Sequence, residues 1–328
     1  MTAKEADNST QFSRWRSYLE RVVEAVDSGK IIPLGPSPAP PVPAAVSAIK
    51  PAATSPKVIY CAPHPDDETL GGGLALRLRL ESGARITNVA VTLGSDHAQR
   101  ERRRRELVSA CQVLGFDLVI PTDPGAASAN GFEDVSLADR EADPQGWAGR
   151  VRALAEIFDT EQPEVIFAPH ADDFNTTHVA THYLATEALG EYLSRRPGAS
   201  VLLIETEFWH EMLDPNLMVA VTLDLAAIQL TAAVEHGGEM RRNPYHLLHP
   251  CRLMNNVRRG SEVVGGQGKA AQPFTFAELY RMSLRRGREG FEPRSGGHIL
   301  PSSEKATLDW MLRAFPPAAA DHSNTRTD

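Results

Sequence analysis

Two segments of the chain combine side chains that can bind a metal ion and transfer a proton. The first, residues 61–73, reads Cys-Ala-Pro-His-Pro-Asp-Asp-Glu-Thr-Leu-Gly-Gly-Gly. His64 and Asp67 offer a nitrogen and an oxygen ligand to a cation such as zinc, and Asp66 between them is left for proton transfer. Acidic residues also favour the first turn of a helix, but helix capping gives no role to His64. We therefore interpret the segment as part of a metal site.

The second segment, residues 169–182, reads Pro-His-Ala-Asp-Asp-Phe-Asn-Thr-Thr-His-Val-Ala-Thr-His. We expect His178 to supply the third ligand. Two histidines and one carboxylate leave a coordination position open for water, which is typical of hydrolytic zinc sites. His182 lies one helical turn beyond His178, but this spacing also arises by chance on helices, so we assign His182 to the surroundings of the ligands.

Both segments follow apolar runs that we expect to be strands. From residue 57 onward, short apolar runs alternate with longer stretches of helical periodicity. This alternation predicts an α/β fold with a mostly parallel sheet and helices on both faces, whose ligands bind beyond the carboxyl ends of the strands. The expected strands are 58–62, 86–93, 117–120, 165–168, 201–204 and 219–223, and the expected helices are 69–82, 100–114, 147–159, 178–195 and 225–235. Residues 121–146 are expected to form a long surface loop, and residues 241–297 loops that wall the pocket.

The chain before residue 57 is expected to lie outside the catalytic domain. Residues 1–32 form a helical segment with apolar side chains every three or four positions: Phe12, Trp15, Tyr18, Leu19, Val22 and Val26. Residues 33–56 are rich in proline and alanine, which is typical of an extended linker. Helix and linker either mediate dimerisation or cover an apolar surface, and an oligomer is possible. The catalytic domain spans 57–316, and residues 317–328 are expected to be disordered.

Composition excludes several classes of protein. The formal net charge is −8, and Glu101 interrupts the basic run at residues 100–105, which disfavours nucleic acid as a partner. No run of about 18 apolar residues occurs, so no membrane span is expected. The three cysteines form no closely spaced pair, which indicates reduced thiols and a cytoplasmic protein. The glycines at 71–73 lack the spacing of a dinucleotide-binding loop, so no nicotinamide cofactor is expected.

The His-Pro-Asp-Asp-Glu segment after a strand, with a histidine-containing segment about a hundred residues later, resembles the PIG-L/LmbE-like deacetylases. The resemblance covers residues 57–238, where Arg103 and Glu106 are similar to the family's Arg-x-x-Glu helix. It implies a Rossmann-like fold. It also implies a metal-dependent enzyme, usually zinc-bound, that deacetylates substrates containing N-acetylglucosamine.

Carried over by position, the resemblance implies His64, Asp67 and His178 as ligands of Zn²⁺ or another divalent metal. It implies Asp66 as the general base, which would deprotonate the metal-activated water and later protonate the leaving amine.

The remaining roles concern the substrate and the support of the ligands. Arg103 and Glu68 are expected to bind the substrate. Asp173 is expected to orient a ligand by hydrogen bonding, as outer carboxylates do for metal-bound histidines.

The chain departs from the family in the second segment. The common family pattern is Asp-x-His-Pro-Asp-His, whereas here Asn175 replaces the first histidine and Thr177 the second aspartate. An amide can donate a hydrogen bond but cannot shuttle a proton. Either Asn175 does part of the catalytic work or another histidine substitutes for it. The candidates are His170, His210, His236 and His298.

The leading hypothesis is a hydrolase that takes a small N-acetylated amino sugar or its conjugate. Two alternatives stay open: hydrolysis of another N-acyl amide, and a catalytically silent member that binds a metal or a sugar. The metal site does not distinguish hydrolysis of an N-acetylated amino sugar from hydrolysis of another N-acyl amide. Asp66 argues against a silent binder, which has no chemical use for a free carboxylate beside a metal.

Overall fold

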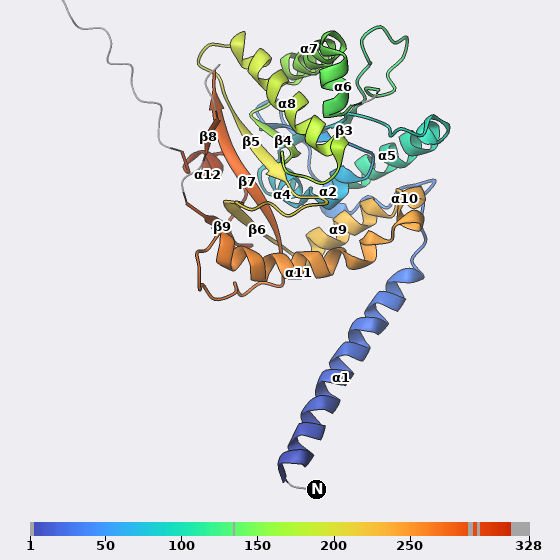
Figure 1. The fold of residues 1–328 in the computed structure, drawn as a ribbon, viewed down its shortest axis with the longest axis vertical. Coiled ribbons are helices and arrows are strands. Elements are labelled where there is room, and N and C mark those ends of the chain that lie inside the picture. The colour runs from blue at the N-terminus through green and yellow to red at the C-terminus, as the bar shows by residue number, and fades with distance from the viewer. Residues whose placement is uncertain (1–2, 134, 288–290, 294–295, 316–328) are drawn as a thin grey trace, which may run out of the picture.

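A computed structural model of the protein describes residues 3–133, 135–287, 291–293 and 296–315. In this part of the chain a nine-stranded sheet runs through the body, and helices cover both of its faces (Figure 1). The α/β fold predicted from the alternating pattern is confirmed. Across the described residues, no helix has the length and apolar character needed to span a membrane.

Five parallel strands form the first part of the sheet, in the order β3-β2-β1-β4-β5. Chain order therefore reverses between β1 and β4, which pair in parallel with Val58 opposite Val165. At such a switch point the connections leave in opposite directions and open a crevice beyond the strand ends. The five strands are β1 (Lys57–Ala62), β2 (Arg85–Ala90), β3 (Asp117–Val119), β4 (Val165–Pro169) and β5 (Ser200–Thr206).

The second part of the sheet is mixed. Strand β7 (Phe276–Arg286) lies antiparallel between β5 and β6 (Leu217–Val221), while β9 (His298–Leu300) pairs with β6 and β8 (Phe291–Pro293) with β7. The expectation of loops over 241–297 was wrong, because the region contains β7 and the helix α11 (Tyr245–Val263). Polar residues that are buried inside β7, Glu278 and Ser283, interrupt its apolar pattern.

Helices pack on the two faces in separate clusters. In β1, Val58 and Tyr60 face one cluster while Ile59 and Cys61 face the other, as the alternation of side chains along a strand requires. The first cluster includes α4 (Gly73–Ser82), α5 (Arg100–Leu114) and α9 (Leu223–Ala233), and the second includes α7 (Pro144–Glu161) and α8 (Thr176–Ser194).

The remaining helices are short or lie outside the two clusters. They are α1 (Ala3–Lys30), α2 (Ala44–Ser47), α3 (Asp67–Leu70), η1 (His97–Gln99), α6 (Leu137–Ala142), α10 (Gly237–Arg242) and α12 (Leu308–Leu312). Two sequence expectations are corrected here. The expected helix at 69–82 is divided into α3 and α4 at two glycines, and the expected loop at 121–146 contains α6, which Ser136 caps.

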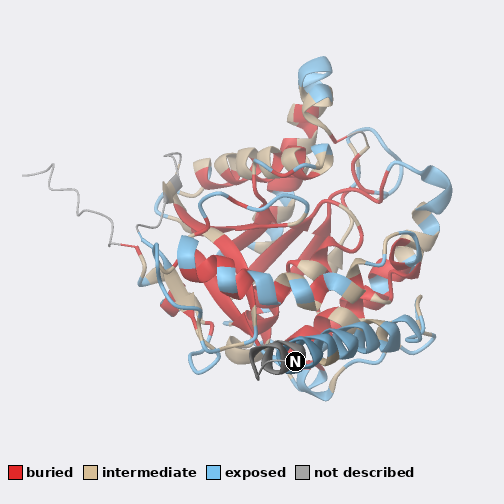
Figure 2. Cartoon of the chain, turned by 60° about the horizontal axis from the view of Figure 1, so that its bottom comes forward, coloured by how far each residue is buried: buried red, intermediate tan, exposed pale blue. Residues whose placement is uncertain are grey.

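The segment before β1 has two parts. Helix α1 extends away from the body and is mostly exposed (Figure 2). The stretch at 33–56 returns along the body and inserts Val46 of α2 into the first cluster. The tail expected to be disordered, 317–328, lies outside the described residues.

Candidate active site

The two chemistry-bearing segments meet at the switch point of the sheet. His64 and Asp67 follow β1 directly, and His178 lies in the first turn of α8, which follows β4. Because β1 and β4 are parallel neighbours, their carboxyl ends lie side by side and both segments open into the same crevice.

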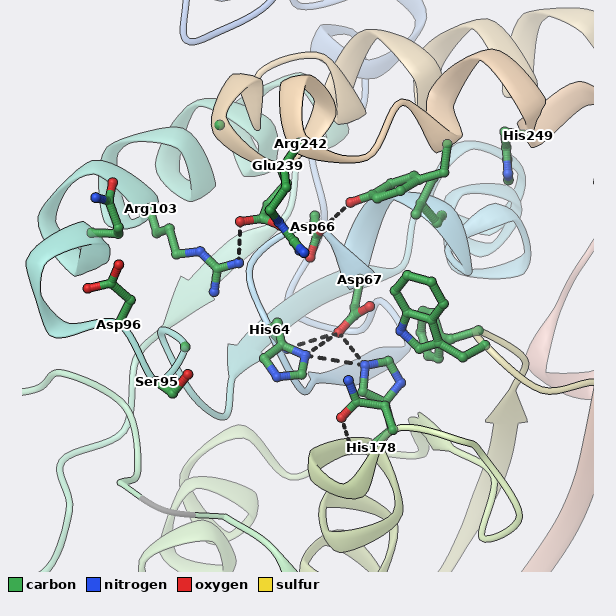
Figure 3. Close-up of a pocket in the computed structure, with 18 of the residues that line it drawn as sticks. His64, Asp66, Asp67, Ser95, Asp96, Arg103, His178, Glu239, Arg242 and His249 are labelled. Carbon is green, nitrogen blue, oxygen red and sulfur yellow. Dashed lines mark hydrogen bonds and ion pairs between the residues drawn. The ribbon is translucent and has the colours of Figure 1, made fainter.

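The three expected ligand atoms converge (Figure 3). The Nδ1 atom of His64 lies 3.2 Å from the Nε2 atom of His178. The Oδ2 atom of Asp67 lies 3.4 Å from Nδ1 of His64 and 3.2 Å from Nε2 of His178. Zinc with bonds of about 2.0–2.2 Å in tetrahedral geometry keeps its ligand atoms roughly 3.3–3.6 Å apart. These spacings fit a small divalent cation with one coordination position open.

The cluster attracts positive charge. Burial disfavours the charged forms of both Asp67 and His178, but their mutual attraction outweighs it. The pKa of Asp67 is therefore lowered, and that of His178 is raised to about 10. A divalent cation can take the place of this proton, since metal ligands must be deprotonated.

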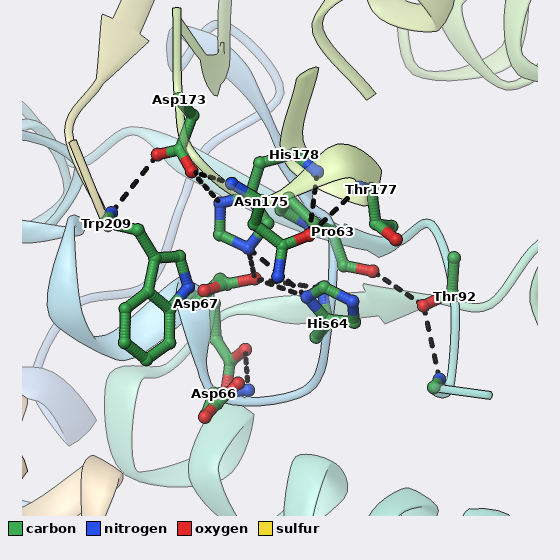
Figure 4. A network of polar contacts seen from close by, with 12 residues as sticks. Pro63, His64, Asp66, Asp67, Thr92, Asp173, Asn175, Thr177, His178 and Trp209 are labelled. Atoms are coloured by element: carbon green, nitrogen blue, oxygen red, sulfur yellow. Dashed lines mark hydrogen bonds and ion pairs between the residues drawn. The ribbon is translucent and has the colours of Figure 1, made fainter. Parts of the chain in front are cut away.

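Asp173 lies behind His178. Its Oδ1 atom is 3.7 Å from Nδ1 of His178, a buried nitrogen that has no hydrogen-bond partner among the described residues. The backbone amides of Asn175 and Trp209 hold this carboxylate at 2.9 and 3.2 Å (Figure 4). Asp173 is thus placed to orient His178. His182 points elsewhere, to the carbonyl oxygen of Pro169 at 3.0 Å.

Asp66 is buried next to the cluster without joining it. Its φ of 120° is strained for a residue other than glycine, and such strain concentrates at functional sites. Its carboxylate accepts a hydrogen bond from the hydroxyl of Tyr245, and its backbone N–H donates to Glu68 at 3.0 Å. Burial, together with the charge of Asp67, raises the pKa of Asp66 to about 7.

Glu68, expected from the sequence to bind the substrate, is buried and is not among the described residues that line the pocket. Its side chain is fully buried, and its Oε1 atom lies 2.6 Å from Nε2 of His236. Burial disfavours a charge on His236, but Glu68 outweighs it and raises the pKa of His236. Glu68 therefore forms a buried ion pair under the strained Asp66.

Replacing Glu68 by alanine is expected to lower the free energy of unfolding by about 3–5 kcal/mol, because His236 loses its counter-charge in a buried site. Urea denaturation would measure the change. Glu101→Ala, which removes an exposed ion pair with Arg105, serves as the control and should cost less than about 1 kcal/mol. Equal effects of the two substitutions would contradict this assignment.

The cluster and Asp66 open into a pocket of about 680 Å³. Arg103 lines its wall and pairs with Glu239 at 2.6 Å, so its guanidinium is held at the surface that a ligand would contact. The loop after β2 contributes Gly94 to the rim, and α11 contributes Tyr245 and Leu248. Charged and polar side chains make up most of the pocket lining, with Leu70, Phe208, Trp209 and Leu248 as its larger apolar members.

Comparison with known proteins identifies the part of the chain that carries the site. A family model described as "PIG-L: GlcNAc-PI de-N-acetylase" matches residues 59–189. These residues form a PIG-L family domain. A relative from Mycolicibacterium gilvum, named 1D-myo-inositol 2-acetamido-2-deoxy-alpha-D-glucopyranoside deacetylase, is 29% identical over 157 residues. That match spans 41% of this chain and 55%, about half, of the relative.

Solved structures share the fold of the PIG-L domain and of part of the chain beyond it. N,N'-diacetylchitobiose deacetylase from Pyrococcus horikoshii is 19% identical, with a TM-score of 0.50, covering 73% of this chain and 88% of its own. A conserved protein from Thermus thermophilus is 20% identical, with a TM-score of 0.50. The match covers 68% of this chain and 93% of the Thermus protein. These likenesses concern the fold alone.

Asn175 of the PIG-L domain caps α8. Its amide oxygen accepts from the backbone N–H groups of Thr177 and His178, at 2.9 and 3.4 Å (Figure 4). The amide nitrogen remains as a donor, and Asn175 lines the pocket. It therefore offers the pocket a hydrogen-bond donor but no group that can carry a proton.

The four histidines considered as substitutes do not line the pocket in the described part of the chain: His170, His210, His236 and His298. His249 does line it, on the side away from the cluster (Figure 3). Burial, with the charge of Arg252, lowers the pKa of His249 to about 3. A histidine that stays neutral is poorly suited to protonate a leaving group.

The site residue that the sequence did not reveal is Tyr245. It lies on α11, beyond the PIG-L domain, lines the same pocket as Asp66 and donates its hydroxyl hydrogen to the Asp66 carboxylate. Glu239 of α10, which holds Arg103, was also missed. Neither residue belongs to a recognisable motif, and their sequence distance from the first segment gives no signal.

Proposed function

We propose that this protein is a metal-dependent hydrolase, with Zn²⁺ as its metal, that removes the N-acetyl group from an N-acetylglucosamine-type amino sugar or its conjugate. The observation that carries the proposal is a buried carboxylate, Asp66, that stands beside a three-ligand cluster at the floor of a pocket without belonging to it. The PIG-L family domain and the M. gilvum relative support the sugar substrate, because both are named for deacetylation of a glucosamine conjugate.

His64, Asp67 and His178 would hold the metal. A divalent cation there would polarise the acetyl carbonyl and acidify a water molecule. Asp66 accepts the proton of the attacking water and returns it to the leaving nitrogen, which needs a carboxylate close to the cluster but outside it. Negative charge that develops on the acetyl oxygen needs a donor, and the amide nitrogen of Asn175, which lines the pocket, is the neutral donor that we assign to it.

Arg103 is proposed to bind the sugar. Its guanidinium carries five N–H donors, and Glu239 engages one side of it, so others remain for hydroxyl groups of a ligand. The pair also limits the freedom of a long side chain, which lowers the entropic cost of binding.

Replacing Tyr245 by phenylalanine is expected to lower kcat by about 10- to 100-fold with little change in KM. A hydrogen bond to a charged group contributes about 1.5–3 kcal/mol, and Tyr245 orients Asp66 through such a bond. Steady-state kinetics at matched metal content would test this. Tyr183→Phe on α8, outside the pocket, is the matched control. A rise in KM with kcat unchanged would instead assign Tyr245 to substrate binding.

The proposed activity is tested with a panel of N-acetylglucosamine conjugates and, beside them, N-acyl peptides. Release of free amine and acetate is measured for metal-loaded protein and for the same protein with a chelator. We expect release from the sugars that the chelator abolishes and added Zn²⁺ restores. Release from the peptides alone would favour another amide substrate, and no release with one ion bound per chain would favour a silent binder.

A further inference from the structure

Helix α11, which lies beyond the PIG-L domain, turns one side toward the pocket. Its pocket-lining residues are Tyr245, Leu248, His249 and Arg252. They are spaced three, four and seven positions from the first, as residues on one side of a helix are. Tyr245 marks the catalytic end, because its hydroxyl donates to Asp66. Arg252 follows about 10 Å further along the helix axis, which exceeds the width of one sugar ring.

Arg252 differs from the other arginines of the pocket. Each of the other three forms an ion pair: Arg102 with Glu106, and Arg103 and Arg242 with Glu239. Arg252 forms none with a carboxylate of the described residues, and one of its nitrogens donates to the backbone carbonyl oxygen of Glu207. A guanidinium carries five N–H donors, so others remain for a ligand.

The carboxylates nearest to Arg252 in the fold are engaged elsewhere. The side chain of Glu207 pairs with Arg259. Burial raises the pKa of Glu278, and the charge of Arg252 opposes this rise from beyond ion-pair distance. Glu278 accepts a hydrogen bond from the backbone N–H of Gly73 at 2.9 Å and does not line the main pocket. The positive charge of Arg252 is therefore left for the pocket.

His249 belongs to the same end of the pocket. It stands one helical turn before Arg252, and Figure 3 shows it on the side of the ligand cluster away from Arg103. The residue is 4% exposed, and its Nε2 atom has no hydrogen-bond partner among the described residues. A polar atom buried in this way is costly unless a ligand satisfies it. The neutral imidazole can do so by donating one hydrogen bond to an oxygen atom.

The acidic side chains that line the pocket lie away from this end. They are Asp66, Asp67, Asp96 and Glu239. Figure 3 shows all four at the ligand cluster or toward Arg103, away from His249. The far end of the pocket along α11 thus combines a positive charge with hydrogen-bond donors, and no carboxylate of the pocket lining stands beside them.

We propose that Arg252 selects substrates in which the group attached to the amino sugar, the aglycone, carries an anionic oxygen group, either a carboxylate or a phosphate. The planar guanidinium can bind both kinds of group with two parallel hydrogen bonds. The pocket of about 680 Å³ has room for such a conjugate, since clefts of roughly 300–1,000 Å³ hold whole drug-sized ligands. The inference rests on the proposed function, which places the acetyl group at Asp66.

Matched aryl glycosides of N-acetylglucosamine test the selection. Their aglycone is a phenyl group that is unsubstituted or carries a para carboxylate, phosphate or aminomethyl group, and each is made as both anomers. Acetate release gives kcat and KM. We expect KM for the acidic glycosides to be about 10- to 100-fold below that for the phenyl glycoside, as a hydrogen bond to a charged group predicts. The lower KM of the two acidic arms identifies the anion. Equal KM values for acidic and neutral glycosides would overturn the proposal.

Variants assign the preference to Arg252. Arg252→Gln should raise KM for the acidic glycosides about 10- to 100-fold and leave the phenyl glycoside unchanged, and Arg252→Glu should favour the aminomethyl glycoside. Arg252→Lys keeps the charge without the planar fork and should keep part of the preference. Arg258→Gln, on an exposed part of the same helix outside the pocket, is the matched control and should keep all of it.

A purely structural role for Arg252 gives a different result. If its hydrogen bond to Glu207 only holds α11 in place, Arg252→Gln would weaken acidic and neutral glycosides equally and lower the unfolding temperature. That outcome would overturn the proposal. Thermal unfolding and metal content of each variant are measured beside the kinetics.

Binding separates a failure of this inference from a failure of the proposed function. Calorimetry measures the affinity of the phenyl and acidic glycosides for the full chain and for Arg252→Gln. Tighter binding of the acidic glycosides that Arg252→Gln abolishes, without acetate release from any glycoside, would refute the deacetylase and support the anion site. Acetate release with equal affinities for acidic and neutral glycosides would support the deacetylase and refute the anion site.

Discussion

Asp66→Asn is expected to lower kcat by about 10²–10⁴-fold while leaving the metal content unchanged. General acid–base catalysis contributes an acceleration of this size, and an amide cannot accept the proton of the attacking water. The substitution also preserves the local structure. Asparagine tolerates a positive φ better than most residues do, so the strained backbone at Asp66 is not strained further.

The neighbouring carboxylate provides a matched comparison. Asp67→Asn makes the same chemical change one residue away, but it replaces a proposed metal ligand, so both metal content and activity should fall. Metal analysis and steady-state kinetics on the two variants would separate the roles. Full turnover by Asp66→Asn would exclude Asp66 as the base, and a loss of metal from this variant would place Asp66 among the ligands.

His178→Gln is expected to remove the metal and with it the activity. The variant loses one of the three convergent ligand atoms, the Nε2 nitrogen of His178 that lies 3.2 Å from Asp67. Loss of a group that only supports a ligand costs about 10- to 100-fold in metal affinity, so loss of the ligand itself should cost more. Metal content after dialysis, and competition with a chromophoric chelator, would measure the change.

His182→Gln is the control for this experiment, since His182 lies one turn further along the same helix. Its ring contacts the carbonyl oxygen of Pro169 and lies 3.4 Å from Glu205, not at the ligand cluster. We expect it to keep the metal and most of the activity. Equal metal loss in both variants would mean that the helix, rather than the ligand, was disturbed.

Local pattern was enough to predict most strands and helices in the first half of the fold, although the helix expected at 69–82 is divided and the loop expected at 121–146 contains α6. The helix expected at 100–114 is observed with the same bounds, and strands β1 and β4 lie within one residue of the expected ranges. Apolar runs and helical periodicity are properties of short stretches of sequence. In this part of the chain, most of the side chains that these patterns mark as apolar are buried in the fold. The C-terminal third was not predictable in this way. Strand β7 inserts between β5 and β6, and its buried Glu278 accepts hydrogen bonds from Gly73 of α4 and Gln229 of α9, which are distant in sequence.

The sequence by itself determined which groups can do the chemistry, because the ligand types and the carboxylate beside them are set by residue identity within two short segments. Only the tertiary structure decided how they act. It placed Glu68 under the pocket, paired with His236, and brought Tyr245 to Asp66 across 179 residues of chain. Contacts of this kind depend on the packing of distant elements, and short-range spacing carries no information about that packing.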